Sequence, residues 1–313
     1  MMTQKIIFAG TPEFAEVSLK ALLDAGIRPC AVYTQPDRAA KRGHHLTPTP
    51  VKKLALENSL EVRTPENFRD PKDIEEFKAL GADLCIVAAY GIILPDEVLN
   101  APRCGCVNIH GSLLPSYRGA APIQRALLDG CSKTGVTLIK LVHELDAGDM
   151  FASAELKIED SDTSATLFDK LATLGAQLML KNLGPILAGT LRPVPQDQSR
   201  ATYAAKLSKD MAPLAFTLNS KKLDLLIRAL NPWPVATARL EGTVYKIFKA
   251  KALDSGAHAD PGAVLGISNE GIEVACAEGS LVLQVIQAPG KGPVNAGSMA
   301  RSNPDKFRGA HFD

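Results

Sequence analysis

The architecture of this chain is read most directly from the segment Val107-Asn108-Ile109-His110-Gly111-Ser112-Leu113-Leu114-Pro115. Its first half predicts a buried strand over Gly105–His110, with Asn108 and His110 on the same face. Open α/β sheets bind ligands at the carboxyl ends of their strands, which is where these two side chains fall. An amide and an imidazole can both donate to an oxygen that gains negative charge during acyl transfer. The alternative is an asparagine and a histidine bonded to backbone in the core, and this strand alone leaves both interpretations open.

On both sides of this segment, short apolar stretches alternate with amphipathic ones. Strand signals alternating with helix signals predict a Rossmann-like α/β domain with a parallel sheet, right-handed crossovers and helices on both faces. The expected strands are Lys5–Ala9, Pro29–Thr34, Asp83–Ala89, Gly105–His110 and Gly135–Val142. The expected helices are Phe14–Ala25, Pro50–Asn58, Asp73–Leu80 and Ala121–Leu128.

The pattern changes in the second half of the chain. A long helix is expected over Ala165–Leu187, a linker over Leu191–Gln198 and a further helix over Lys221–Leu230. Five short strand signals then follow, and their spacing predicts a small antiparallel barrel. They are Ala236–Leu240, Val244–Ala250, Gly262–Ile267, Gly271–Ala275 and Leu281–Gln287. We therefore expect two domains, residues 1–205 and residues 206–313.

A carboxylate follows the fifth expected strand, in Val142-His143-Glu144-Leu145-Asp146-Ala147-Gly148-Asp149. Small residues beside Asp146 indicate a tight loop where backbone approaches a ligand. In a parallel sheet Asp146 would emerge at the same edge as His110, where it could orient the imidazole. The alternative is a turn residue that bonds its own backbone, and spacing does not separate the two.

Composition bounds the class of protein. The chain has 313 residues, of which 46% are hydrophobic and 22% are charged, as in a soluble globular protein. The six cysteines contain no C-x-x-C pair, which fits free thiols in a reducing cytosol. No signal peptide begins the chain, and no apolar stretch approaches the roughly 20 residues of a membrane span. We expect a cytoplasmic protein with no membrane association.

Two common nucleotide motifs are missing. Gly10-Thr11-Pro12-Glu13 follows the first strand but lacks the second and third glycines of a dinucleotide fingerprint, which disfavours a nicotinamide dehydrogenase. The phosphate-binding loop G-x-x-x-x-G-K-[ST] is also absent from the sequence.

The central segment, together with Arg118-Gly119-Ala120-Ala121-Pro122-Ile123-Gln124-Arg125-Ala126, resembles the signature of the folate-dependent formyltransferases. Three other segments resemble the same family, so the similarity extends over nearly the whole chain. They are Phe8–Ala15, Gln35-Pro36-Asp37-Arg38 and Asn231-Pro232-Trp233-Pro234. The closest resemblance is to the branch that formylates the amine of methionyl initiator tRNA. It implies a Rossmann-like catalytic domain followed by an OB-like barrel that assists tRNA binding, usually in a monomer.

The resemblance also implies roles for single residues. Asn108, His110 and Asp146 match the catalytic trio of the family. The formyl donor would be 10-formyltetrahydrofolate, and no metal is implied. Two segments match the folate-binding positions: Ser112, Leu113, Leu114 and Pro115 in one, and Tyr90, Gly91, Ile92, Ile93 and Leu94 in the other.

A basic segment provides the evidence for RNA. Residues 38–56 contain five basic side chains and no acidic one, and glycine and prolines make much of it loop-like. Such a loop suits contacts with phosphates and base edges, although a solvated surface loop is an equal alternative on charge alone. The resemblance places the tRNA contacts at Arg38, Lys41 and Arg42, with Arg42 at the key position. The segment after residue 205, with 13 Lys and Arg against 10 Asp and Glu, is mildly basic and would be a second contact surface.

The sequence departs from the family pattern in two places, and three rival functions share some of its features. Ser116-Tyr117 replaces the usual basic residue and tryptophan of the family, which removes a positive charge, and His143-Glu144 is more polar than the family pattern. The rivals are formylation of a nucleotide-linked amino sugar, hydrolysis of formylfolate, and RNA binding without catalysis. The second domain argues against the hydrolase, and the intact trio argues against a non-catalytic protein.

Overall fold

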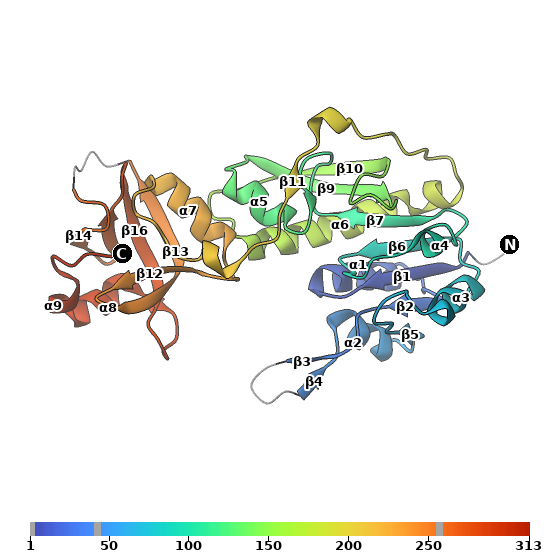
Figure 1. Cartoon of the computed structure of the whole chain (residues 1–313), viewed down its shortest axis with the longest axis horizontal. Coiled ribbons are helices and arrows are strands. Elements are labelled where there is room, and N and C mark those ends of the chain that lie inside the picture. Colours follow the sequence, from blue (N-terminus) through green and yellow to red (C-terminus); the bar gives the residue numbers. More distant parts are fainter. Residues whose placement is uncertain (1–3, 41–44, 255–258) are drawn as a thin grey trace. The chain divides into compact units, whose positions relative to one another are not determined.

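The computed structural model describes residues 4–40, 45–254 and 259–313 (Figure 1), and the chain divides into two units, each assembled from three segments. The first unit contains residues 1–122, 133–157 and 168–204. The second contains residues 123–132, 158–167 and 205–313. The chain therefore leaves the first unit twice before residue 205. The functional division into residues 1–205 and 206–313 stays a prediction.

The first unit is built on a seven-stranded sheet with the order β10-β9-β7-β6-β1-β2-β5. In that order the strands are Met150–Lys157, Lys133–Lys140, Cys106–His110, Leu84–Ala88, Ile6–Gly10, Ala31–Tyr33 and Val62–Arg63. The five strands from β7 to β5 are parallel, which confirms the predicted α/β class. At the other edge, β9 runs antiparallel to β7, and β10 runs antiparallel to β9. The expectation of a parallel fifth strand was therefore wrong.

The missed strand β10 has a physical reason. It is an edge strand in which no residue is fully buried, so its residues Met-Phe-Ala-Ser-Ala-Glu-Leu-Lys show no apolar run. The return from β9 to β10 is a hairpin connection, and an antiparallel neighbour needs no crossover helix. The alternation of helices and strands predicts only strands that are joined by crossover helices, so it does not predict β10 at this edge.

Several helices begin at a residue whose side chain caps the first turn. Thr49 accepts a hydrogen bond from the backbone of Lys52 and Asp70 accepts one from Lys72, each just before a proline in the first turn. The helices lying wholly or mainly in the first unit are α1 (Glu13–Asp24), α2 (Pro50–Glu57), α3 (Pro71–Ala79), α4 (Asp96–Leu99) and α6 (Ser164–Leu187). Short pairs join β3 (Arg38–Ala40) to β4 (His45–Thr47) and β8 (Arg118–Gly119) to β11 (Tyr203–Ala204).

The second unit contains an antiparallel sheet with the order β12-β13-β16-β15-β14, and β17 pairs with β16. The C-terminal segment forms bridges from Phe312 to Leu240 and from His311 to Ala263, at the two ends of this order. This links the edges of the sheet, in agreement with the predicted barrel. The strands β12–β17 are Ala236–Leu240, Thr243–Leu253, Val264–Ile267, Ile272–Ala275, Ser280–Gln287 and Val294–Asn295. The helices of this unit are α5 (Pro122–Leu128), α7 (Ser220–Ala229), α8 (Ala296–Ser302) and α9 (Pro304–Phe307).

Candidate active site

Asn108 and His110 lie on the same face of β7, as the alternation predicts. Cys106, two residues earlier, packs into the apolar cluster beneath α3 and α4, whereas Ile109 faces α6. The contact with α6 is so close that a Cβ on Gly175 would lie 2.6 Å from the Ile109 Cγ2. The backbone therefore presents Asn108 and His110 on the face that α3 and α4 cover.

The imidazole of His110 is buried, with 6% of its surface exposed. Its Nε2 lies 3.0 Å from the backbone carbonyl oxygen of Tyr117, to which it donates. Its Nδ1 lies 3.6 Å from Oδ2 of Asp146, an ion-pair separation rather than a hydrogen bond. Asn108 is half-buried, and no described residue hydrogen-bonds to its carboxamide. The site thus holds one imidazole between two oxygens and one amide without a described partner.

Asp146 reaches His110 by a route that the sequence did not predict. Because β9 is antiparallel to β7, His110 lies opposite Thr137, and the end of β9 at Lys140 lies opposite Val107. The loop at 141–149 therefore starts beside the beginning of β7 and must fold back to bring Asp146 to the imidazole. Leu141 packs against the cluster beneath α3 and α4, which places the start of this loop on the same face. The juxtaposition was predicted, but its structural reason was wrong.

Two residues of the site have left-handed backbone. Tyr117 has φ of 62° and Asp146 has φ of 50°. Aspartate tolerates this conformation better than tyrosine, for which it is strained. Strained residues of this kind cluster at functional sites, where surrounding contacts hold them. Here the strain at Tyr117 aims its carbonyl at His110.

The turn after β7 is held by hydrogen bonds to neighbouring strands. Thr137 of β9 donates its hydroxyl to the carbonyl of Ser112 at 2.7 Å and accepts from the backbone of Leu114 at 3.1 Å. The Ser112 hydroxyl donates to the carbonyl of Ser116 at 2.6 Å, and the peptide between Leu114 and Pro115 is cis. The four residues predicted to bind folate are therefore fixed beside the strand that carries His110. Their contact with folate remains a prediction.

The other predicted folate segment follows β6, the parallel neighbour of β7, so both segments lie at the same sheet edge. Tyr90 is buried, and burial raises the pKa of its hydroxyl. Its carbonyl accepts from Thr11 at 2.8 Å and from Gln35 at 3.0 Å. Ile93, in contrast, is 89% exposed. Within this segment, Tyr90 serves the core and Ile93 faces solvent.

The predicted tRNA-binding residues lie mostly beyond what the structure describes. Lys41 and Arg42 fall outside the described residues, and Arg38 is described only as backbone at the start of β3. Of the basic residues in segment 38–56, Lys52 binds the carboxylate of Asp37 at 2.7 Å, so its charge is paired at the base of the β3–β4 hairpin. The prediction of a basic contact loop therefore rests on the sequence.

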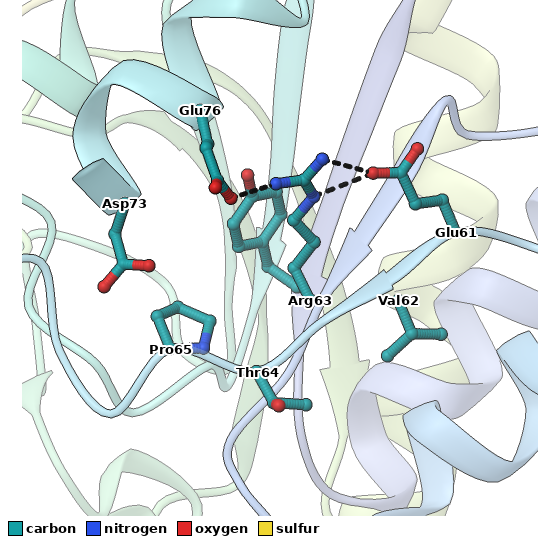
Figure 2. Close-up of a pocket in the computed structure, with 8 residues that line it drawn as sticks. Glu61, Val62, Arg63, Thr64, Pro65, Asp73 and Glu76 are labelled. Carbon is teal, nitrogen blue, oxygen red and sulfur yellow. Dashed lines mark hydrogen bonds and ion pairs between the residues drawn. The ribbon is translucent and has the colours of Figure 1, made fainter.

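A cavity of about 440 Å³ lies beside β2 and β5, away from the candidate site (Figure 2). Arg63 donates to the carboxylates of both Glu61 and Glu76, as the dashed lines of Figure 2 show. β7 is separated from β5 by β6, β1 and β2. None of the residues that line this cavity is one of the predicted catalytic residues. They are Tyr33, Glu61, Val62, Arg63, Thr64, Pro65, Asp73 and Glu76.

Three residues near the site went unassigned by sequence reasoning. Gln196 lies in the segment predicted to be a linker, yet it is 5% exposed and bonded to the Asp146 loop. Arg118 is 3% exposed and bonded to Gln196. The backbone of Gly119 donates to Oδ2 of Asp146 at 2.8 Å. Arg118 and Gly119 belong to the family signature, but Gln196 has no signal in the sequence, since a glutamine between a proline and an aspartate is typical of an exposed segment.

Over the ranges that the structure covers, no group of three or more His, Cys, Asp or Glu side chains is arranged to hold a metal ion. Within the same ranges, no helix combines the length and the apolar character needed to span a bilayer.

The sequence matches two family models and close curated relatives. The formyl transferase model matches residues 4–183, and the model of the formyl transferase C-terminal domain matches residues 206–304. A methionyl-tRNA formyltransferase of Stutzerimonas stutzeri is 49% identical over 308 residues, which is 98% of each chain. A methionyl-tRNA formyltransferase of Methylococcus capsulatus is 48% identical, covering 93% of this chain and 94% of the relative.

Solved structures resemble the fold at lower identity. An N-formyltransferase of Helicobacter canadensis, solved with folinic acid and dTDP-3-aminofucose, has a TM-score of 0.67 at 19% identity and covers 91% of this chain and 100% of its own. HypX of Aquifex aeolicus, solved with tetrahydrofolic acid, has a TM-score of 0.62 at 18% identity and covers 95% of this chain and 46% of its own. These likenesses concern the fold alone.

Proposed function

This chain belongs to the formyl transferase family, and from that premise we propose that it transfers the formyl group of 10-formyltetrahydrofolate to the amine of methionyl initiator tRNA. The product is N-formylmethionyl-tRNA, the species with which translation begins. The observation that supports this proposal most strongly is the 49% identity to a methionyl-tRNA formyltransferase over 98% of both chains. In the structure, His110 also lies beside Asp146.

The reaction balances without a further reagent. The nitrogen of the methionyl amine attacks the formyl carbon, and a tetrahedral oxyanion forms. The bond between that carbon and N10 of the folate then breaks, so an amide forms and tetrahydrofolate leaves. The amine loses one proton and N10 gains one.

We assign stabilisation of the oxyanion to Asn108 and His110. The Asn108 carboxamide has no described partner to give up, so it can donate at once. His110 contacts oxygens with both nitrogens, so it must exchange the Tyr117 carbonyl or the Asp146 carboxylate to donate to the oxyanion. One such donor is typically worth about 3 kcal/mol of transition-state stabilisation.

Asp146 has the role of orienting His110 and directing the proton of the amine. Hydrogen bonds of catalytic groups are often long before substrate binds, which fits the 3.6 Å separation from Nδ1. Holding both substrates in one geometry supplies up to roughly 7–11 kcal/mol more. These two effects together require no metal ion.

Binding of the substrates is divided along the chain in this proposal. The folate lies against residues 90–94 and 112–115, which share one sheet edge. The tRNA contacts Arg38, Lys41 and Arg42, and the barrel assists. We expect a monomer that acts in the cytoplasm, where both substrates occur.

The test supplies 10-formyltetrahydrofolate with a labelled formyl group. Initiator methionyl-tRNA, elongator methionyl-tRNA and a dTDP-linked amino sugar are offered as separate acceptors. We expect label on initiator tRNA, and much less when Arg42→Ala replaces the wild-type chain. Label on the amino sugar with none on tRNA would overturn the proposal in favour of the sugar-modifying rival, and folate consumption without transfer would favour the hydrolase.

A further inference from the structure

The side chain of Gln196 has all of its hydrogen-bonding capacity occupied. Its Nε2 donates to the backbone carbonyls of Asp146 at 2.8 Å and Gly148 at 2.7 Å. Its Oε1 accepts from Nε of Arg118 at 3.1 Å and from Nη2 of Arg118 at 2.7 Å. A carboxamide has two donor hydrogens and two acceptor lone pairs, so these four contacts satisfy it fully. Gln196 therefore fixes the loop on both sides of Ala147.

Arg118 determines which way this amide points. A guanidinium has donors only and does not lose its proton, so the group that faces it must be an acceptor. The oxygen of Gln196 must then face Arg118, and its NH₂ group must face the loop. No described carboxylate pairs with Arg118, since its remaining side-chain hydrogen bond runs from Nη1 to Oε1 of Gln198 at 2.9 Å.

The loop needs such support because Asp146 has left-handed backbone and reaches His110 against the strand direction. Gln196 holds the backbone of this loop, whereas the carboxylate of Asp146 accepts from the backbone of Gly119, the neighbour of Arg118. The separation of 3.6 Å between Nδ1 of His110 and Oδ2 of Asp146 is a few tenths of an ångström beyond a hydrogen bond. A small movement of the loop therefore decides whether the two groups engage.

We propose that Gln196 is a positioning residue for the formyl transfer: it holds the Asp146 loop at the distance from His110 that the reaction requires, and Arg118 fixes its orientation. This inference rests on the proposed function. It assigns a role to the segment between the two family-model matches, residues 184–205, of which neither model includes any part.

The decisive variant is Gln196→Glu. Its shape is unchanged and it still accepts from Arg118, but it offers the two loop carbonyls an acceptor in place of a donor. We expect kcat to fall about 10- to 100-fold, as when the partners that orient a reactive group are lost, while KM for either substrate changes less than about 3-fold. Gln198→Glu is the matched control, because Gln198 also accepts from Arg118 but is exposed, and no described residue of the loop at 141–149 hydrogen-bonds to its side chain.

A double-mutant cycle separates positioning from general damage. In an Asp146→Asn background, Gln196→Glu should lower kcat less than about 2-fold further, because the group that it positions is already gone. Full multiplication of the two effects would contradict the proposal. So would Gln196→Glu with wild-type kcat, or Gln198→Glu with an equal loss.

A second readout does not depend on the acceptor. The ¹⁵N resonances of the His110 ring, assigned by their loss in His110→Asn, should shift in Gln196→Glu and in Asp146→Asn but not in Gln198→Glu. Unchanged His110 resonances in Gln196→Glu would overturn this inference even if tRNA is formylated. Shifted resonances with no formyl transfer to tRNA by the wild-type protein would instead overturn the proposed function and leave this inference standing.

Discussion

Arg63 and Arg118 belong to the same unit and have opposite surroundings. Arg63 borders the cavity of Figure 2, keeps 29% of its side chain exposed, and is bonded to two glutamates. Arg118 is buried beside the candidate site and is bonded to two glutamines. A carboxylate only accepts hydrogen bonds, so neither Glu61 nor Glu76 can donate to a backbone carbonyl of a neighbouring loop. An amide also donates, so Gln196 links Arg118 to the loop that carries Asp146.

The difference shows how a buried arginine can support a neighbouring loop when amides, and not carboxylates, are its hydrogen-bond partners. An ion pair would satisfy Arg118 more strongly than two amides, but it would leave no donor for the loop carbonyls. Burying a guanidinium with neutral partners costs free energy, and such costs are typical of sites rather than of cores. The same unit therefore contains one arginine that pairs with carboxylates at the surface and one that is bonded, through Gln196, to the loop that carries Asp146.

The largest expected effect tests whether the candidate active site near Arg118 carries out the reaction. His110→Asn should lower kcat by about 10²–10³-fold, because it removes one donor to the oxyanion and the partner of Asp146. Single-turnover formyl transfer measures the change, and circular dichroism checks that the protein is folded. Near-normal turnover by folded His110→Asn protein would contradict the assumption that Arg118, unlike Arg63, lies beside the reactive site.

Replacing each arginine tests the comparison directly. Arg118→Met should lower kcat about 10- to 100-fold and the free energy of unfolding by about 1–3 kcal/mol, because Gln196 loses its partner and is free to reorient. Arg63→Met should leave kcat within about 2-fold and change stability by about 1 kcal/mol or less, as for other surface ion pairs. Steady-state kinetics and urea unfolding measure both. Equal losses of kcat would abolish the distinction between the two arginines.

A smaller effect is expected at the turn that neighbours the site. A Cβ on Gly135 would lie 2.5 Å from Cδ2 of Leu113 and 2.2 Å from the carbonyl of Ala154, so Gly135→Ala should displace the predicted folate turn. We expect a loss of about 1–3 kcal/mol of stability and a KM for the folate raised a few-fold. Gly184→Ala, in α6 with open space around its Cβ, is the control and should be neutral or stabilising.

The smallest effect concerns a third arginine. Arg103 donates to Asp83, and this hydrogen bond, with a second from the Lys5 backbone, lowers the pKa of that carboxyl below its ordinary 3.8. A lowered pKa contributes stability above the unfolded value, and this stability is lost as pH falls through the folded value. Arg103→Leu should therefore be less stable than the wild type at pH 6, and the gap should narrow at pH 3. A gap that widens on acidification would contradict this assignment.

Much of the architecture could be predicted from local patterns. Apolar strands between amphipathic helices predicted the parallel core, and the barrel strands were marked by their glycines. The placement of Asn108 and His110 on one face followed from period-two alternation on one strand, and their chemistry stays a prediction. These features are local in sequence, which is why they could be read without coordinates.

The parts that could not be predicted depend on long-range contacts. Nothing local distinguishes an antiparallel β9 from a parallel one, so the approach of Asp146 to His110 was expected for a wrong reason. Gln196 lies 50 residues from Asp146 in sequence, and only the fold brings them together. The basic side chains of Lys41 and Arg42 stay a sequence-based prediction.

The assembly of each unit from separate segments of the chain also has a consequence for synthesis. As the chain leaves the ribosome, the first unit gains its last residue at Ala204, and with it the β8–β11 pair. Residues 123–132 and 158–167 have been made by then, but the remainder of their own unit starts only at Ala205. Domains usually fold in order of emergence. Here residues 123–132 and 158–167 are synthesised before most of the unit to which they belong, so they can complete it only after residues from Ala205 onward have emerged.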